Sequence, residues 1–422
     1  LYDPKYYHTD FLKNWEDYTC QSGTIHPDCI DLNTEGKEVQ DYLIDTYTKY
    51  IEMGVDAFRV DTAKHISRVM INRHFAPAFK KAGGDDFYMA GEVLTKIFEV
   101  WNKGVAPLSA PFYTWKEGAN SVSSGIGDTY SSDDVIAAKE GYDAEMARGV
   151  QGQPESNNHL LDGNTYREPN YSQASGFSVI DCHMHVNFSD AGSAYNVKGN
   201  DKYYNDATYN LVYVDSHDYG PATSGERYAG GKEAWAENIS LMFTFRGIPT
   251  LYYGSEIQFK AGMPVDGDPN KLALANSGRA YFGDEIEGSV TTTDFGIWSN
   301  ATGAMANALN NPVSKHLMAL NRIRREIPAL QKGQYSTEGI NNSGVAAFKR
   351  RYTKDGIDSM ALVTISGGAT FTGVPNGTWV DVITGDIQNG TTVTANCSGK
   401  GNLRVYVLNG SKIDGLMGEY IK

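Results

Sequence analysis

The stretch Gly54-Val55-Asp56-Ala57-Phe58-Arg59-Val60-Asp61 is an apolar, β-like run that ends in a carboxylate. Two further runs have the same design: residues 87–92 end in Glu92, and residues 211–218 end in the pair His217-Asp218. In a parallel barrel, side chains at the carboxyl ends of the strands converge on one face, where such enzymes carry out their chemistry. The three acids therefore predict a catalytic site.

Helices are predicted between these strands. Residues 34–37 offer a helix start, Gly54 ends the helix, and a seven-residue stripe lies on one helical face: Val39, Tyr42, Leu43, Thr46, Tyr47, Tyr50 and Ile51. A second helix is expected over 66–82, before the strand 87–92. Strands alternating with helices imply parallel pairing and an α/β barrel.

Three later strands continue the alternation, at 177–182, 211–218 and 247–256, with helices at 231–246 and 311–326. Five strands are visible, whereas a closed (β/α)8 barrel needs eight. We therefore expect strands 4–8 of a TIM barrel over residues 34–327, with the first three strands upstream of Leu1. Residues 1–33 are interpreted as a loop or the end of an inserted domain B.

After Pro328 the sequence pattern changes to short runs of alternating apolar and polar residues, separated by Gly, Asn and Asp. These runs lie at 346–351, 360–365, 378–381 and 404–408. This pattern predicts a small antiparallel β-sandwich over residues 328–410. Residues 411–422 are interpreted as a linker or tail.

The composition narrows the class of partner. The 422 residues carry a net charge of −14, which argues against nucleic acid or an anionic membrane surface. The sequence contains no run of 18 or more apolar residues, so it predicts no transmembrane helix. The 27 Tyr and 6 Trp could stack on sugars or cap the core; the candidate platforms between Glu92 and Asp218 are Trp101, Tyr113, Trp115 and Tyr130.

Cysteine and histidine patterns are less decisive. Cys20 and Cys29 flank a Gly-containing loop and could form a small disulfide or remain thiols, while Cys182 is expected to be a buried thiol. The spacing of His183 and His185 could suit a metal. We interpret them instead as strand-end histidines near the cleft.

The two nearest acids have different surroundings. Arg59 lies on the same strand face as Asp61, and a neighbouring cation keeps a carboxylate ionised. Glu92 follows apolar residues, which raises a carboxyl pKa. A retaining glycosidase needs one acid of each kind. Taken singly, Arg59 and Asp61 could instead form a structural pair, with Glu92 facing solvent.

Jointly the motifs are more specific. Gly-Val-Asp-Ala-Phe-Arg-Val-Asp-Thr-Ala-Lys-His (54–65), Ala-Gly-Glu-Val (90–93), Val-Asp-Ser-His-Asp (214–218) and Gly-Ile-Pro-Thr-Leu-Tyr-Tyr-Gly-Ser-Glu (247–256) resemble, in order, the signatures of the alpha-amylase family, glycoside hydrolase family 13. Asp-Cys-Ile-Asp-Leu-Asn (28–33) resembles the end of that family's domain B, and residues 321–330 resemble its eighth barrel helix leading into domain C.

The resemblance implies roles for individual residues. Asp61 would be the nucleophile, Glu92 the general acid/base and Asp218 the transition-state stabiliser. Substrate-binding roles fall on four residues: Arg59, Lys64, His65 and His217. A structural calcium ion is also implied, with the backbone carbonyl of His65 among its ligands. The family's first signature, which supplies a further calcium ligand and substrate-binding residues, is absent from this sequence.

The expected function is a retaining, endo-acting α-1,4-glucan hydrolase that cleaves starch and maltooligosaccharides. The alternatives are a glucanotransferase that forms cyclodextrins and a non-catalytic glucan-binding relative. Starch is too large to enter cells, so we expect a secreted or cell-surface protein. We also expect a monomer, with further carbohydrate-binding modules as an open possibility.

Overall fold

The computed structural model describes residues 3–94, 102–116, 134–149, 152–265, 272–294 and 297–422. The chain forms two compact units. Unit 1 comprises Leu1–Asn157, Pro169–His183 and Asn200–Leu211, and unit 2 comprises Asn158–Glu168, Met184–Gly199 and Val212–Lys422. These units do not coincide with the expected barrel and domain C, whose boundaries stay predictions.

Unit 1 contains the first α/β repeats of the chain. Its helices and strands are α1 (Thr19–Ser22), α2 (Lys37–Glu52), β1 (Ala57–Val60), α3 (Arg68–Met70), α4 (Ala76–Gly83), β2 (Tyr88–Gly91), α5 (Asp134–Arg148) and β3 (Ser178–Val179). Helix α2 ends where the sequence predicts, because Gly54 adopts a positive φ of 100° that favours glycine.

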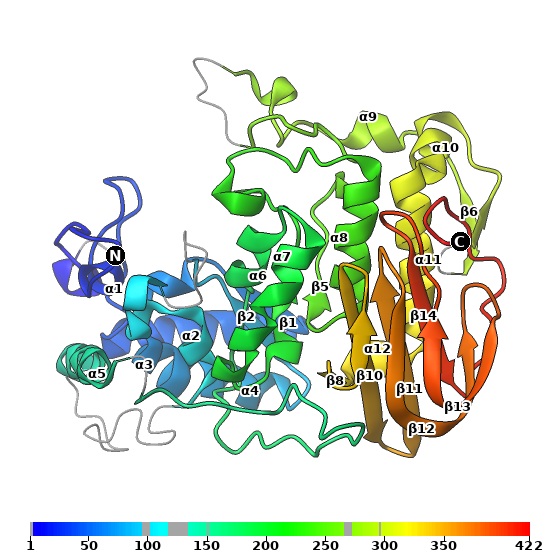
Figure 1. Cartoon of the computed structure of the whole chain (residues 1–422). Coiled ribbons are helices and arrows are strands. Elements are labelled where there is room, and N and C mark those ends of the chain that lie inside the picture. Colours follow the sequence, from blue (N-terminus) through cyan, green and yellow to red (C-terminus); the bar gives the residue numbers. More distant parts are fainter. Residues whose placement is uncertain (1–2, 95–101, 117–133, 150–151, 266–271, 295–296) are drawn as a thin grey trace. The chain divides into compact units, whose positions relative to one another are not determined.

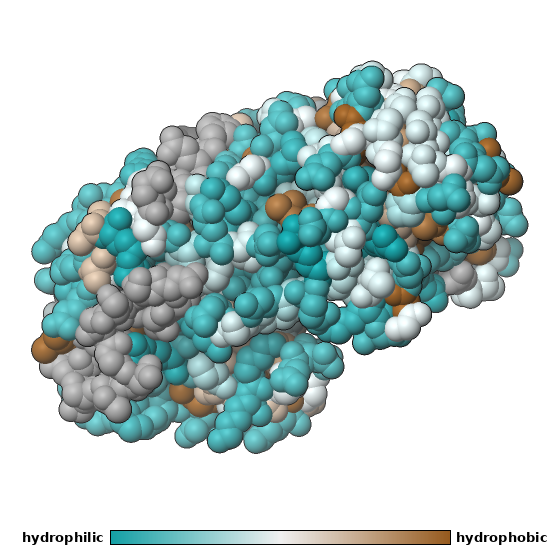
Figure 2. Space-filling view, turned by 60° about the horizontal axis from the view of Figure 1, so that its bottom comes forward, coloured by the Kyte–Doolittle hydropathy of each residue, from teal (hydrophilic) through white to brown (hydrophobic). Residues whose placement is uncertain are grey.

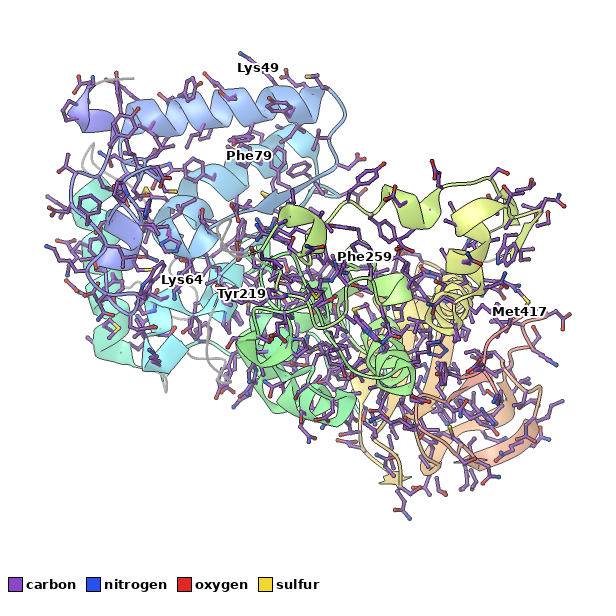
Figure 3. The ribbon with its side chains drawn as sticks, turned by 90° about the horizontal axis from the view of Figure 1, so that it is seen from above. Lys49, Lys64, Phe79, Tyr219, Phe259 and Met417 are labelled. Atoms are coloured by element: carbon purple, nitrogen blue, oxygen red, sulfur yellow. The ribbon has the colours of Figure 1, made fainter. Side chains whose placement is uncertain are left out.

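The predicted helix over 66–82 is correct in position but is not continuous. A five-residue π-helical turn, Ile71–Phe75, separates α3 from α4. Pro77 lies in the first turn of α4, and because proline has no N–H it cannot complete the α-helical hydrogen bond to the preceding turn. Phe79 projects from α4 toward α2 (Figure 3), where its ring centroid lies 6.2 Å from that of Tyr47.

Parallel pairing in unit 1 is confirmed. The strand order is β1-β2-β3, with Ala57 opposite Tyr88 and Ala90 opposite Ser178. A parallel bridge from Ile180 to Leu211 extends the same pattern. All three strands are shorter than predicted, and β1 stops at Val60 because the chain turns through a left-handed Thr62 (φ 49°).

The boundary between the units falls within β4 (Leu211–Val212), after which unit 2 has its own α/β part. Its other helices and strands are α7 (Ala191–Asn196), α8 (Lys232–Thr244), β5 (Ile248–Pro249), α9 (Gly283–Ile286), β6 (Thr291–Asp294), β7 (Ile297–Ser299), α10 (Gly303–Asn310), α11 (Pro312–Glu326), α12 (Pro328–Lys332), β8 (Gln334–Ser336), β9 (Ile340–Asn342), β10 (Ala346–Lys354), β11 (Ile357–Ile365), β12 (Ala369–Asp381), β13 (Ile387–Ala395) and β14 (Leu403–Leu408). β4 pairs with β5. The five predicted barrel strands all occur, although the described strands do not close a barrel.

The carboxyl-terminal strands are antiparallel, as predicted, but they do not form two separate sheets. β8 to β14 belong to one seven-stranded sheet of order β13-β12-β14-β11-β10-β8, with β9 also paired to β12 (Figure 1). The long strand β12 changes register between Thr372 and Gly377, and such a bulge bends a strand. β12 therefore pairs with β9, β13 and β14 along its length, while one buried cluster includes Ala347 of β10, Phe371 of β12 and Val393 of β13.

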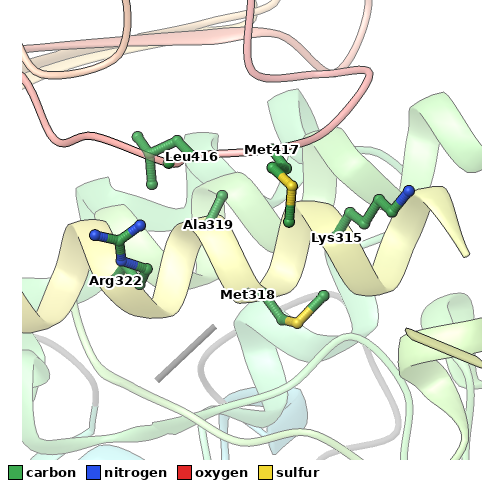
Figure 4. Close-up of a pocket in the computed structure, with 7 residues that line it drawn as sticks. Lys315, Met318, Ala319, Arg322, Leu416 and Met417 are labelled. Atoms are coloured by element: carbon green, nitrogen blue, oxygen red, sulfur yellow. The ribbon is translucent and has the colours of Figure 1, made fainter. Parts of the chain in front are cut away.

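Residues 411–422, expected to be a linker or tail, pack on unit 2. The side chains of Ile413 and Tyr420 are buried, and the Arg322 guanidinium of α11 donates a 2.7 Å hydrogen bond to the Asp414 carbonyl. Figure 4 shows Leu416 and Met417 passing over α11 beside Ala319. The sequence gives no apolar period in so short a segment, so this packing could not be predicted.

Two other expectations concern the surface. On the face drawn in Figure 2, hydrophilic residues predominate and hydrophobic ones are scattered among them. Among the described helices, none has the length and apolar character needed to cross a membrane.

The disulfide that the sequence left open is not present in the structure. No disulfide joins Cys20, which is buried, to Cys29, which is exposed.

Candidate active site

In unit 1 the structure brings together Arg59, Asp61 and Glu92. The guanidinium of Arg59 donates one hydrogen bond to the Asp61 carboxylate and another, 3.0 Å long, to Oε2 of Glu92. Arg59 and Asp61 share a face of the extended chain because side chains alternate along a strand. The parallel register places Gly91 beside Val60, so the residues that follow the two strands, Asp61 and Glu92, meet at one edge.

The backbone fixes the edge that carries these acids. The Glu92 N–H donates to the Val60 carbonyl at 2.8 Å, and the Glu92 carbonyl accepts from the Lys64 N–H at 3.1 Å. Gly91 allows the approach, because a Cβ there would lie 2.4 Å from the Phe177 ring. These two main-chain hydrogen bonds fix the position of Glu92 at this edge.

The two carboxyl groups differ in exposure and in proton affinity. The Asp61 side chain is 69% exposed and that of Glu92 is 14% exposed. Burial, followed by a hydrogen bond to Asp61, raises the pKa of Glu92 to about 7, although Arg59 opposes the change. The direction expected from the apolar sequence before Glu92 is therefore confirmed. Near neutral pH, Glu92 can hold or release a proton beside an accessible carboxylate.

Lys64 and His65 lie in the 3-10 turn Ala63–His65 directly after the acid-bearing edge. Lys64 is only 6% exposed, so it offers little surface to a sugar in this structure. The ring Nδ1 of His65 lies 2.9 Å from the carbonyl of Cys20, and burial lowers the pKa of His65 to about 4. His65 is thus a neutral imidazole that links the amino-terminal segment to the edge.

Unit 2 presents a second group built on the loop after β4. His217 Nε2 lies 2.9 Å from Oδ2 of Asp218. Arg279 binds the same two residues. Its Nη2 donates a hydrogen bond to Oδ1 of Asp218 at 3.1 Å, and its Nε donates one to the His217 carbonyl at 2.9 Å. Both carboxylate oxygens of Asp218 are therefore engaged, which fixes the orientation of the group.

Behind this group lies a buried ion pair. Arg227, 2% exposed, lies 3.4 Å from Asp215, which is 3% exposed, and the Ser255 hydroxyl donates to Asp215 at 2.6 Å. Arg227 also donates to the carbonyls of Tyr253 and Gly278. One guanidinium thus ties together the loops that carry Asp218 and Arg279. Neither Arg227 nor Arg279 was predicted from the sequence, since both lie outside the recognised motifs.

Two of the four candidate stacking platforms are buried. Tyr113 and Trp115 are 0% and 3% exposed, and the Trp115 indole donates to the Tyr203 carbonyl at 2.8 Å. Of the two alternatives left open for these residues, stacking or core packing, the structure supports core packing. Trp101 and Tyr130 lie outside the described residues.

The resemblance noted above implies a calcium site. The described residues contain no group of three or more His, Cys, Asp or Glu side chains arranged to hold a metal ion. His183 and His185, in helix α6 (Cys182–Asn187) rather than at a strand end, are buried. The implied calcium site, with the backbone carbonyl of His65 as one ligand, stays a prediction.

Comparison with known proteins identifies the family. The profile of the alpha-amylase catalytic domain matches residues 24–277. An alpha-amylase of Streptomyces lividans is 24% identical over 393 residues, covering 89% of this chain and 36% of the relative. A cyclomaltodextrin glucanotransferase of Klebsiella oxytoca is 22% identical over 413 residues, covering 90% of this chain and 50% of the relative. The chain thus spans half or less of the length of these relatives.

Solved structures share the fold. An alpha-amylase of Geobacillus thermoleovorans complexed with acarbose superposes with a TM-score of 0.54 at 18% identity, covering 96% of this chain and 72% of that one. The cyclomaltodextrin glucanotransferase CldA gives a TM-score of 0.55 at 17% identity, covering 97% and 67%. With more than half of the chain matched by the catalytic-domain profile, this protein belongs to the alpha-amylase family, glycoside hydrolase family 13.

Proposed function

We propose that this protein is a retaining glycoside hydrolase that cleaves α-1,4-glucans such as starch and maltooligosaccharides within the chain. The observation that carries the proposal is the Arg59 guanidinium bonded to both Asp61 and Glu92. Double displacement needs two neighbouring carboxyl groups, of which one is ionised and one protonated. The exposed Asp61 and the buried Glu92, with its raised pKa, suit these two states.

The proposed reaction has two steps. In the first, Asp61 attacks the anomeric carbon while Glu92 gives its proton to the glycosidic oxygen, so that the leaving sugar departs neutral. In the second, Glu92 takes a proton from water, which attacks the glycosyl–Asp61 ester and releases the product. Arg59 keeps the Asp61 carboxylate ionised and aimed by its hydrogen bond.

Asp218 and His217, in unit 2, have proposed roles of their own. We assign Asp218 to stabilising the positive charge that develops on the sugar ring and His217 to binding its hydroxyl groups. Arg279 supports this assignment, because its bonds to Asp218 and to the His217 carbonyl hold both residues in one orientation. Lys64 and His65 are retained as candidates for contacts with the leaving-group sugars.

The alternative within the family is a glucanotransferase, which passes the same intermediate to another sugar. It is favoured by the similarity to cyclomaltodextrin glucanotransferases, which at 23% identity is close to the 24% identity with an alpha-amylase. Product analysis with maltoheptaose separates the two. Shorter maltooligosaccharides alone support hydrolysis, whereas longer or cyclic products support transfer and would exclude a pure hydrolase.

A non-catalytic glucan-binding protein is the third possibility. All three acids are present, which counts against it. The variants Asp61→Asn and Glu92→Gln test it directly: each should abolish most turnover of maltoheptaose. Undiminished turnover in either variant would remove the catalytic assignment of that acid.

Three further proposals follow from family membership. A calcium ion would have the His65 backbone carbonyl as one ligand; a fall in melting temperature on adding EGTA, reversed by Ca²⁺, tests it. The polymeric substrate suggests a secreted or cell-surface location, which cell fractionation tests. A monomer is proposed, and light scattering measures it.

A further inference from the structure

Unit 1 contains a pocket of about 660 Å³ at the amino-terminal ends of β2 and β3. Phe87 and Phe177, both buried, contribute apolar lining, and α4 supplies Pro77 and Lys80. Glu92 follows the opposite, carboxyl-terminal end of β2, so the pocket is separate from the acid-bearing edge. Its volume falls within the range of about 300–1,000 Å³ that is typical of small-ligand sites.

Two exposed tyrosines line this pocket. Tyr171 and Tyr209 are 42% and 49% exposed, and their rings meet edge to face with centroids 6.0 Å apart. The Tyr171 hydroxyl donates a 2.8 Å hydrogen bond to the buried Asp206, and burial raises the pKa of Tyr171 well above its ordinary value. The hydroxyl therefore stays a donor, and the ring is held in place.

The backbone under Tyr209 is fixed as well. Its carbonyl accepts hydrogen bonds from the hydroxyls of Tyr88 and Ser178, at 2.5 and 2.8 Å. Asp206 also caps the 3-10 turn Ala207–Tyr209 by accepting from the Thr208 N–H. A ring that is ordered before binding loses little conformational entropy when a ligand arrives. These tyrosines are thus preorganised, although they face solvent.

The polar lining indicates the charge of the ligand. Three carboxylates, those of Asp85, Asp86 and Asp206, accompany two lysines. Both ammonium groups already donate to backbone carbonyls, Lys80 to that of Asp85 at 2.9 Å and Lys116 to that of Ser172 at 3.1 Å. Such a lining does not favour an anion. It offers acceptors to hydroxyl groups, and the tyrosine rings offer apolar faces to C–H groups.

We propose that this pocket is a second binding site for a neutral oligosaccharide, a short α-glucan, apart from the site that contains Asp61 and Glu92. The α-glucan class rests on the proposed function; the preference for a neutral, hydroxyl-rich ligand rests on the lining alone. The site would hold the enzyme on its polymer while the acids act on another stretch of chain.

Binding to the Glu92→Gln variant of the full chain tests the proposal, because this variant should not consume the probe. Titration calorimetry with maltoheptaose measures affinity, and hydrogen exchange locates the contact. We expect slower exchange in peptides that span 85–89 and 205–211. Adding Tyr209→Ala should weaken the binding responsible for that protection at least tenfold, whereas Tyr209→Phe, which keeps the ring, should change it less than threefold.

The matched control is Tyr42→Ala on α2, which removes another exposed tyrosine, 64% exposed, and should leave affinity unchanged. Unaltered protection and affinity in the folded Tyr209→Ala variant would overturn the proposal, as would equal binding of cellohexaose. Turnover of maltoheptaose, measured with Glu92 intact, separates the two ideas. Protection of the pocket without any turnover would refute the proposed function alone, and turnover without protection would refute the second site alone.

Discussion

The proton on Glu92 gives the sharpest prediction, because it links stability with activity. Burial raises the pKa of Glu92 from 4.5 to about 7, which at about 1.4 kcal/mol per pH unit amounts to about 3 kcal/mol. The folded protein holds this proton more tightly than the unfolded chain does. The stabilisation is therefore fully present below pH 4.5 and is lost as the pH rises through 7.

The variant Glu92→Gln removes the titration while keeping the shape of the side chain. Relative to the parent, its free energy of unfolding should rise by up to about 3 kcal/mol between pH 4.5 and pH 8. Its turnover should fall by roughly 10²–10⁴ through loss of general acid–base catalysis. Urea denaturation of both proteins at pH 5 and pH 8, with kcat against pH, measures the two effects.

The control is Glu285→Gln, which replaces an exposed carboxyl in unit 2 and should change neither quantity. Parallel stability curves for the parent and the Glu92→Gln protein would refute the argument, because they would show that Glu92 titrates alike in the folded and unfolded chains. A kcat for Glu92→Gln equal to that of the parent would refute its role as proton donor independently of stability.

Three other changes test separate parts of the account. Arg279→Ala removes a charge-assisted hydrogen bond to Asp218, which is worth about 1.5–3 kcal/mol. The kcat for maltoheptaose should therefore fall about 10–100-fold, and Arg279→Lys should restore part of it. An unchanged kcat would contradict the positioning role of Arg279. Burial lowers the pKa of His8, but the hydrogen bonds that its ring donates to the carboxylates of Asp31 and Glu35 outweigh burial and raise the pKa from 6.5 to about 9. Stability that is present below pH 6.5 should therefore be lost as the pH rises through 9, by at most about 3 kcal/mol. In urea denaturation His8→Gln should abolish this slope, and a persisting slope would exclude His8. Trp379→Ala empties a fully buried site and should cost about 3–5 kcal/mol in urea denaturation, whereas a loss below 1 kcal/mol would show that the sheet repacks around it.

The part of the site that could be predicted from the sequence depends on local rules. Strand alternation places Arg59 beside Asp61, and parallel pairing brings Glu92 to the same edge. The apolar residues before Glu92 gave the correct direction of its pKa. These inferences need only neighbours in sequence or adjacent parallel strands.

Other features depend on contacts between distant segments. Arg279 and Asp218 are hydrogen-bonded although they lie 61 residues apart in the sequence, and no motif near Arg279 predicts that contact. Stacking and core packing both stayed open for Tyr113 and Trp115, because aromatic residues suit both a core and a sugar site. Tyr171 and Tyr209, which are exposed, carry no stronger sequence signal. The single carboxyl-terminal sheet likewise results from a register change within β12 that the alternating pattern does not reveal.

The central claim is that Asp61 becomes covalently glycosylated. Incubating the Glu92→Gln variant with α-maltosyl fluoride tests it most directly, since fluoride leaves without an acid but the ester then lacks the base that hydrolyses it. Mass spectrometry of the intact protein should show one added maltosyl group, located by peptide mapping on Asp61 and absent after a further Asp61→Asn change. No adduct, or an adduct on another residue, would contradict the assignment.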